Sequence, residues 1–450
     1  MVSVSSVNLD VLELIFAYLS GNDLASIALV SRSFFAGVIP RLYSTLLFRA
    51  SHSKRYPAVI SPFAAIAAHP ELAIHVRHVD IREIPNVKSH YNPKFLLECR
   101  RALEMCPNIT SFRCSKNTVP PLIGALEKQD RLHDLRINAS LTTDQSIKII
   151  KLSKIRNLTL DFASWNLMNL LPQWTGTLRS NLITLTLFMA NELNETVLGA
   201  ALAELPGLLG LHIVGCAKVD HAAIFRLVTH TPLLESLSLT TGEASRPLSQ
   251  PPSSLACLRN LAIDTRLTPV GPMHPPSTSA LSAILTYINA SSPRLVSFIV
   301  KYPDRQMAIP NSLIQQLITA HAPTLRNLSF IDCALGTTDS LTALCRACTQ
   351  LERLEIWIPV RDLTIFTVAI SRSSTLRTLV GVGAHTHSPG PSLAQDSVRV
   401  MMMGVPSLQK VVAGEGRIWT RRKDPRGHLA IGLERRPNHV AAIHWFMPRE

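Results

Sequence analysis

Charged residues are scarce in this chain, which argues against a disordered protein. Of its 450 residues, 17% are Asp, Glu, Lys or Arg, whereas 46% are hydrophobic. Disordered chains show the opposite balance, with high charge and few apolar side chains. The composition therefore predicts a large core, and the length suits two or three ordinary domains or one elongated array.

The sequence also lacks an uncharged apolar run of about 18–20 residues, the length that a membrane-spanning helix needs. Its first six residues have neither the basic start nor the apolar core of a secretory signal peptide. We therefore predict a cytoplasmic or nuclear protein without a membrane partner. In these compartments its eight Cys would be reduced thiols.

Motifs of known catalytic and cofactor sites are missing. The chain has no Gly-x-Ser-x-Gly elbow and no Gly-Lys-Ser/Thr loop, and Gly381-Val382-Gly383 lacks the third glycine of a dinucleotide fingerprint. Cys345 and Cys348 have the spacing of half a zinc site, but a second Cys pair is missing. His385 and His387 have no carboxylate or Cys pattern beside them. We expect core packing for the two Cys and a turn for the two His, and we predict a non-enzyme with no cofactor and no metal.

The net charge of +14 is concentrated in two segments. Residues 41–101 hold 10 Lys and Arg against 4 Asp and Glu, and residues 414–450 hold 8 against 4. Local basic surface suits an acidic partner or a nucleic acid, but solvated Arg side chains on the surface are the more common explanation. We predict no nucleic-acid partner, and we keep Arg421, Arg422 and Lys423 as candidates for an acidic partner or a nuclear import signal.

The stretch from Leu9 to Leu19 is too apolar for an ordinary surface helix, because only Asp10 and Glu13 are polar. A helix packed against one core needs one apolar stripe, whereas this one has two apolar sides and so asks for a second partner. Helical spacing predicts that one side of the helix is formed by Leu12, Ile15, Phe16 and Leu19. A second side is formed by Val11, Leu14 and Tyr18. Asn8 is the predicted N-cap of this helix, and Asn22 or Asp23 that of a second helix.

This stretch resembles the F-box, the helical module by which substrate receptors of cullin-type ubiquitin ligases dock onto a small adaptor. The family usually has Pro where this chain has Asn8, and often Trp where it has Phe34. An ordinary helical hairpin that caps a larger domain is the alternative. The resemblance is carried by Ile15-Phe16-Ala17-Tyr18-Leu19, Asp23-Leu24, Leu29-Val30-Ser31-Arg32 and Pro40-Arg41-Leu42-Tyr43.

The resemblance implies that residues 1–48 form an all-α module, followed by a connection over 49–69. The module would bind an adaptor of the S-phase-kinase-associated type and, through it, a cullin. The implied adaptor-binding residues, as contacts or as support, are Leu9, Leu12, Ile15, Phe16, Leu19, Leu24, Leu29 and Val30.

From residue 70 to 413 a pattern of three apolar residues recurs. Two spacer residues separate the first apolar residue from the second, and one spacer residue separates the second from the third. Alternate apolar residues predict a short strand with one buried face, and a helix precedes most of the strands. A repeat of this kind buries its apolar face only by stacking on its neighbours, which predicts parallel strands inside and helices outside. The triplets are Val76-Val79-Ile81, Ile109-Phe112-Cys114, Leu132-Leu135-Ile137, Ile155-Leu158-Leu160, Leu182-Leu185-Leu187, Leu208-Leu211-Ile213, Leu234-Leu237-Leu239, Leu258-Leu261-Ile263, Leu295-Phe298-Val300, Leu325-Leu328-Phe330, Leu351-Leu354-Ile356 and Leu376-Leu379, with a weak last one at Leu408-Val411.

The α/β array looks like an irregular leucine-rich-repeat solenoid. That family places Asn or Cys three residues after the last strand Leu, a position held here by Asn117, Cys216 and Cys333. Predicted helix caps are Asn194, Asp220, Asn311 and Asp339. The strand spacers are expected to be exposed on the concave face and are Arg136, Thr159, Thr186, His212, Ser238, Ser329 and Glu355.

Two stretches interrupt the repeats. Residues 244–277 hold seven Pro and predict a stiff insertion. Residues 414–450 form a basic tail, in which Trp445 and Phe446 are expected to cap the last repeat.

An F-box followed by irregular leucine-rich repeats is similar to many fungal F-box receptors. The two resemblances together imply a substrate-recognition subunit of a cullin-type (SCF) ubiquitin ligase that binds an unknown protein substrate with its repeats. The alternative is a leucine-rich-repeat scaffold for protein interactions that acts outside a ligase.

Overall fold

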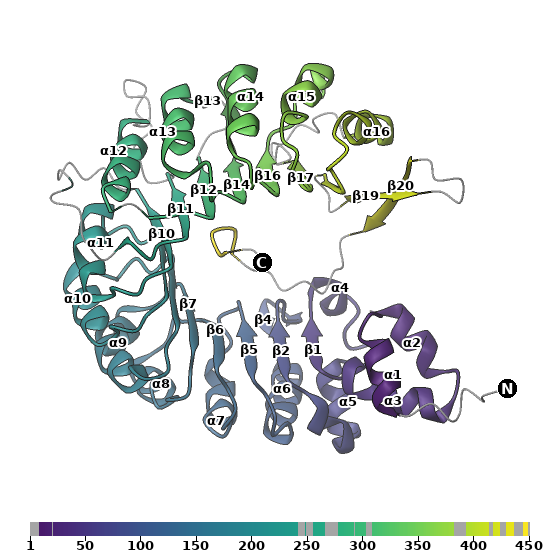
Figure 1. Cartoon of the computed structure of the whole chain (residues 1–450). Coiled ribbons are helices and arrows are strands. Elements are labelled where there is room, and N and C mark those ends of the chain that lie inside the picture. The colour runs from purple at the N-terminus through teal and green to yellow at the C-terminus, as the bar shows by residue number, and fades with distance from the viewer. Residues whose placement is uncertain are drawn as a thin grey trace. The chain divides into compact units, whose positions relative to one another are not determined.

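The computed structural model describes residues 9–19, 21–241, 248, 255–265, 278–291, 293–302, 308–381, 393–413, 417–423, 429–435 and 444–448 (Figure 1). The chain divides into two compact units, unit 1 from Met1 to Glu192 and unit 2 from Leu193 to Glu450. The predicted Asn8 cap, the turn at His385 and His387, and most of the Pro-rich stretch 244–277 lie outside the described residues.

Unit 1 opens with three helices, α1 Leu9–Phe16, α2 Asn22–Ala28 and α3 Arg32–Leu42. Its sheet is wholly parallel in the order of the chain. The strands are β1 Thr45–Phe48, β2 His78–Ile81, β5 Ser111–Cys114, β6 Asp134–Asn138, β7 Asn157–Asp161 and β8 Thr184–Phe188. Between them lie α4 Ala50–Ser53, α5 Pro62–Ala68, the 3₁₀ helices Pro70–His75 and Pro120–Leu122, the hairpin of β3 Asn86–Val87 and β4 His90–Tyr91, α6 Pro93–Met105, α7 Ile123–Leu126, α8 Thr143–Ile149 and α9 Trp165–Leu178.

Unit 2 continues the same alternation of strand and helix. Its parallel strands are β9 Gly210–Val214, β10 Ser236–Thr240, β11 Asn260–Asp264, β12 Ser297–Lys301, β14 Asn327–Ile331, β16 Arg353–Ile356, β17 Thr378–Gly381 and β18 Lys410–Val412. Its helices are α10 Glu195–Ala203, α11 His221–Leu227 with the 3₁₀ turn Val228–His230, α12 Thr278–Asn289, α13 Asn311–His321, α14 Thr338–Ala347, α15 Leu363–Ile370 and α16 Gln395–Gly404. A small parallel pair, β13 Ala308–Ile309 and β15 Ala334–Leu335, lies outside the main sheet.

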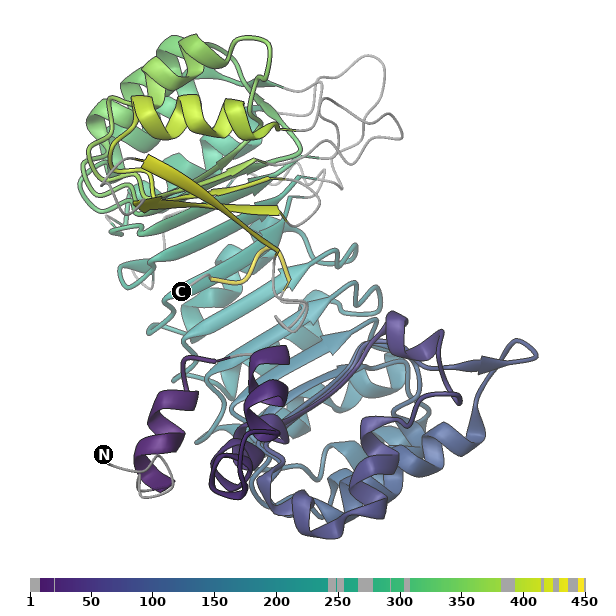
Figure 2. The ribbon, with the colours of Figure 1, turned by 90° about the vertical axis from the view of Figure 1, so that its right-hand side faces the viewer.

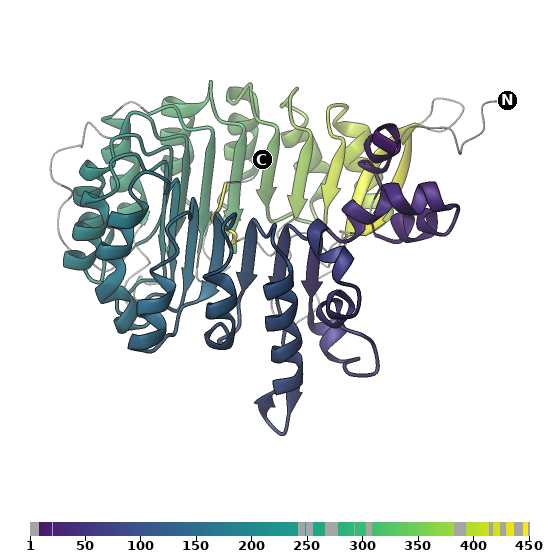
Figure 3. The same cartoon turned by 90° about the horizontal axis from the view of Figure 1, so that it is seen from below.

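The triplets of the sequence form the core of both units. Their middle residues pair across the strands, for example Leu135 with Leu158 in unit 1 and Leu237 with Leu261 in unit 2, and they are buried. In each unit the helices lie along one side of the sheet (Figure 3), which is the side that receives these apolar residues. The predicted fold class is confirmed, because the strands and helices form an α/β array of leucine-rich-repeat type.

The sheet begins earlier than the sequence predicted. β1 pairs with β2 in the parallel register, although residues 1–48 were expected to be helical and the array to start at residue 70. Phe48 of β1, Phe63 of α5 and Phe95 of α6 form one buried aromatic cluster, in which the rings of Phe48 and Phe95 are 4.3 Å apart. Residues 45–68 therefore form the first repeat of the array, and the expected connection over 49–69 contributes to the core.

Two antiparallel strands close the other end of the array (Figure 2). β19 Arg417–Lys423 pairs with the last parallel strand β18, and β20 Leu429–Arg435 pairs with β19. Ile418 and Trp419 of β19 are buried. This hairpin protects the apolar end of the last repeat, so the prediction that Trp445 and Phe446 cap this end is wrong.

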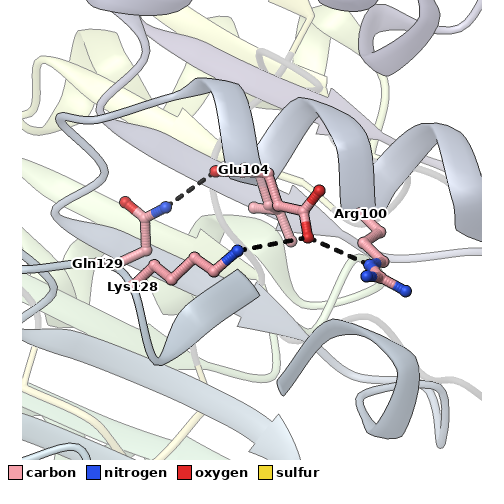
Figure 4. A network of polar contacts seen from close by, with 5 residues as sticks. Arg100, Glu104, Lys128 and Gln129 are labelled. Carbon is pink, nitrogen blue, oxygen red and sulfur yellow. Dashed lines mark hydrogen bonds and ion pairs between the residues drawn. The ribbon is translucent and has the colours of Figure 1, made fainter. Parts of the chain in front are cut away.

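A polar network connects α6 to the segment that follows α7 (Figure 4). Gln129 donates a hydrogen bond from Nε2 to the carbonyl oxygen of Leu103 at 2.8 Å, near the end of α6. The Glu104 carboxylate lies 3.2 Å from Arg100 Nε and 3.9 Å from Lys128 Nζ. Both cations are exposed, so the buried amide of Gln129 contributes the specific contact and the ion pairs add little.

His321, at the end of α13, makes the stability of unit 2 dependent on pH. Burial lowers the pKa of its imidazole to about 4, against about 6.5 in an unfolded chain. As the pH falls below 6.5, the unfolded chain takes up a proton that the folded chain does not yet bind. The stabilisation is therefore complete above pH 6.5 and is lost as the pH falls towards 4.

We expect the free energy of unfolding to fall by about 2–3 kcal/mol on this account between pH 7.5 and pH 4.5. The measurement is denaturant unfolding of the parent and of His321→Leu at the two pH values. The variant should lose less stability than the parent on acidification, and identical losses would contradict the assignment.

Candidate interaction surfaces

The three N-terminal helices enclose a small core of their own. Gly37 of α3 permits the close approach of α1, because a Cβ atom there would lie 3.1 Å from Phe16 Cε2. Ser31 caps α3 by accepting a hydrogen bond from the Phe34 amide at 3.1 Å. The buried residues are Leu12, Phe16, Leu24 and Val38, and Leu19, Ile27, Ala28, Phe34 and Leu42 pack against them.

A second side of α1 carries apolar residues that this core does not cover. Val11, Leu14, Ile15 and Tyr18 are 44% to 93% exposed. Their spacing of three, four and seven residues places them on one face of the helix and of the turn that ends it. This exposed stripe lies beside the buried stripe of Leu12 and Phe16.

Further apolar side chains are exposed where α2 meets α3. Leu29 and Val30, between the two helices, are 89% and 66% exposed, and Phe35 in the first turns of α3 is half exposed. With the α1 stripe, seven large apolar or aromatic side chains of this short module face outwards. An exposed apolar surface of this kind is typical of a site that contacts another molecule.

The structure sorts the eight predicted adaptor-binding residues into two groups. Leu12, Phe16 and Leu24 are buried in the module itself, and Leu19 is partly buried against them. Of Leu9 only the backbone is described, as the first residue of α1. The residues that are open to a partner are Ile15, Leu29 and Val30.

The predicted adaptor-binding set does not include the exposed side chains of Val11, Leu14, Tyr18 and Phe35, although Val11, Leu14 and Tyr18 were predicted to form a second apolar side of the helix. The prediction also grouped Ile15 with Leu12 and Phe16, whereas the structure places Ile15 on the exposed side of α1. The signal for the exposed stripe is the spacing 11, 14, 15 and 18, which is as regular as that of the buried stripe.

A second candidate surface is the face of the unit 2 sheet opposite its helices, which we call the inner face. The register of the strands aligns one row across it, which consists of His212, Ser238, Ala262, Ile299, Ser329 and Glu355. All six residues are buried. The prediction that strand spacers are exposed is wrong for four of this row and for Thr186, whereas Arg136 and Thr159 are half-buried. Strands about 4.8 Å apart shield small side chains between them.

Two polar groups of this row contact the end of the chain. His212 Nδ1 lies 2.7 Å from Ser238 Oγ, which donates a hydrogen bond to the Phe446 carbonyl oxygen at 3.1 Å. Because a hydroxyl has one proton to donate, the Ser238 oxygen accepts from a His212 Nδ1–H. Burial lowers the pKa of His212 to about 3, which keeps the imidazole neutral in this arrangement.

Most of the cysteine side chains lie in the core. Seven of the eight are buried and Cys257 is exposed. The side chains of Cys345 and Cys348 are buried, so the predicted core packing of this pair is confirmed. Burial raises the pKa of Cys345 to about 12 and that of Cys348 to about 11. Cys216 and Cys333 are buried after their strands, whereas Asn117 is exposed. Among the described residues, no group of three His, Cys, Asp or Glu side chains is placed to bind a metal ion.

A helix that crosses a bilayer must be both long and apolar. Within the described ranges, no helix is both.

The chain is similar to several solved structures. No protein-family model matches the chain, and no curated protein matches it in sequence. A solved complex of Rad7 and Elc1 in yeast contains a chain with 19% identity and a TM-score of 0.40, over 72% of this chain and 75% of that chain. An internalin, inlF of Listeria monocytogenes, has 11% identity and a TM-score of 0.31, over 76% and 81%. A leucine-rich-repeat protein of Leptospira interrogans has 12% identity and a TM-score of 0.29, over 76% and 85%. The fold assignment rests on the strand order and register of this chain itself.

Proposed function

We propose that this chain is a substrate-recognition subunit of a cullin-type ubiquitin ligase and that its N-terminal helices are an F-box. The observation that carries the proposal is the exposed apolar surface of a module whose own core is already closed. Leu12 and Phe16 complete that core from α1, and Leu14, Ile15 and Tyr18 are left for a partner. An F-box needs this division, because it must stay folded while it offers apolar side chains to the adaptor.

The exposed side chains are numerous enough for a specific interface. Full burial of a Leu, Ile or Val side chain contributes about 1.5–3 kcal/mol. Leu14 and Ile15 on α1 and Leu29 and Val30 beyond α2 are each more than half exposed in this chain. An apolar adaptor surface that covers them would gain this free energy without a change in the fold of the module.

The role of the chain in such a complex would be to bring two proteins together. The adaptor and a cullin would bind at the F-box, and a protein substrate at the repeat array. Tethering raises the effective concentration of the substrate near a ubiquitin-charged enzyme elsewhere in the complex. The chain supplies no nucleophile in this proposal, and the burial of seven of its eight Cys supports that view.

The test is binding of the full-length chain to the purified ligase adaptor of the S-phase-kinase-associated type. We expect the parent to bind and Leu14→Asp with Ile15→Asp to lose binding at least a hundredfold. Two carboxylates without partners in an apolar interface cost about 3 kcal/mol or more. Because both side chains are exposed, the double variant should keep the circular dichroism spectrum and melting temperature of the parent.

A matched control is available on an array helix. Ile365 and Val368 of α15 are also more than half exposed and adjacent on one helix face. Ile365→Asp with Val368→Asp adds the same charges and should leave adaptor binding unchanged. A folded parent that does not bind the adaptor would overturn the proposal and favour a scaffold that acts outside a ligase.

A further inference from the structure

The segment His444–Pro448 lies on the inner face of unit 2, far along the chain from the strands it touches. Figure 1 shows this yellow segment on the side of β10 to β12 that faces away from the helices. The side chain of Phe446 is only 1% exposed. Phe446 and Pro448 line a shallow hollow together with Ser238, Ala262 and Ile299. A short segment with one completely buried ring has the features of a bound peptide.

One polar contact to this segment is made to its main chain. Ser238 Oγ donates to the carbonyl oxygen of Phe446, and His212 holds the Ser238 hydroxyl from the next strand. A main-chain carbonyl is present in every peptide, so this contact fixes the position of a bound segment and leaves its sequence open. The choice of sequence must come from the side chains.

The side-chain contacts are aromatic and cationic. The Phe446 ring stacks on His444 at 4.8 Å between centroids and meets Trp445 edge-on at 5.5 Å. Lys301 Nζ lies 5.5 Å from the centre of the Trp445 ring, a distance at which an ammonium group is attracted to the face of an indole. The inner face thus buries one aromatic ring, that of Phe446, and places a cation beside a second, that of Trp445.

We propose that the inner face at Ser238, Ala262, Ile299 and Lys301 is a binding site for a short peptide turn with two adjacent aromatic residues, like the turn that Met447 N–H closes on the His444 carbonyl oxygen at 3.1 Å. In the free chain residues 444–448 occupy this site, and a partner protein that carries a peptide of the same chemistry displaces them. Unit 2 alone forms the site, so the proposal does not depend on the ligase function. Because residues 444–448 belong to the same chain, their effective concentration at the site is high, and only a peptide that binds tightly can displace them.

The test uses a fluorescent peptide of residues 437–450 as the probe and the full-length chain as the receptor. Phe446→Asp in the chain should expel its own segment, because a carboxylate cannot replace a buried ring. We expect this variant to bind the probe at least tenfold more tightly than the parent. A probe with alanine at position 446 should bind neither chain, and adding Ser238→Ala to the receptor should weaken binding about fivefold.

Three outcomes would overturn the proposal. The first is equal affinity of the probe for the parent and for Phe446→Asp, and the second is no binding to either. The third is that the parent sediments as a dimer and Phe446→Asp as a monomer, because residues 444–448 would then occupy the inner face of a second copy of the chain. Phe446→Ala serves as the receptor if the Asp variant does not show the circular dichroism spectrum of the parent.

Discussion

Phe16→Ala is expected to unfold the N-terminal helices while the strands of the array stay folded. Phe16 is buried between α1 and α3, where its ring lies 5.4 Å from that of Phe34 and against the backbone at Gly37. Loss of a buried Phe ring costs about 3–5 kcal/mol. A core with four buried apolar residues has little stability to spare for a loss of this size.

The neighbouring residue provides the matched comparison. Ile15 is more than half exposed, so Ile15→Ala should change the free energy of unfolding by about 0.5 kcal/mol or less. Hydrogen exchange of peptides from residues 9–42 and from residues 111–188 separates the module from the array. Phe16→Ala should raise exchange in the first set alone, and Ile15→Ala in neither. Unchanged exchange in the Phe16→Ala module would contradict the assignment of the core.

The strands of the array were predictable because their signal is local. Each strand places alternate apolar residues on the helix side of the sheet whatever its neighbours are, so Leu211, Leu237 and Leu261 can be recognised without knowledge of the fold. Cap prediction was less reliable. Asn194 and Asp220 cap α10 and α11 as predicted, whereas Gly21 holds the N-cap position of α2 in place of the predicted Asn22 or Asp23.

Two other predicted caps fail because a nearby residue holds the position. Asn311 is the first residue of α13, after Pro310, and its side chain accepts a hydrogen bond from Ser340 instead. Asp339 lies inside α14, since Thr337 accepts the hydrogen bond from the Ser340 amide. A sequence window contains several suitable cap residues, and the packing of the chain chooses among them.

The division of the candidate sites could not be predicted, because it depends on contacts distant in sequence. The two stripes of α1 are equally apolar, and α3 decides which is buried by packing Val38 and Gly37 against Leu12 and Phe16. The contact of Phe446 with Ser238 spans 208 residues. A local pattern identified the aromatic pair at 445 and 446 as apolar, but it held no information on which strands the pair would reach.

Arg421→Met is the second substitution for which we expect a large effect. Arg421 belongs to a basic run that the sequence analysis kept for an acidic partner or an import signal, yet its guanidinium points at the end of α16. It donates to the carbonyl oxygens of Leu408 at 2.8 Å and Val405 at 3.1 Å, and also to that of Met402. The last carbonyls of a helix have no partner within the helix and attract a cation. Removal of the guanidinium should cost about 3 kcal/mol, because several carbonyl groups lose a charged donor.

Arg422 provides the control that separates the contacts of Arg421 from the loss of one positive charge. Arg422 pairs with Glu434 at 2.9 Å, with both side chains about half exposed, and this hydrogen bond lowers the pKa of the Glu434 carboxyl. Such a surface pair contributes about 0–1 kcal/mol, so Arg422→Met removes the same charge at little cost. Denaturant unfolding with hydrogen exchange of residues 395–412 should show destabilisation for Arg421→Met alone. Equal effects of the two variants would mean that the guanidinium of Arg421 is not a helix cap, and the basic run would again be free for a partner.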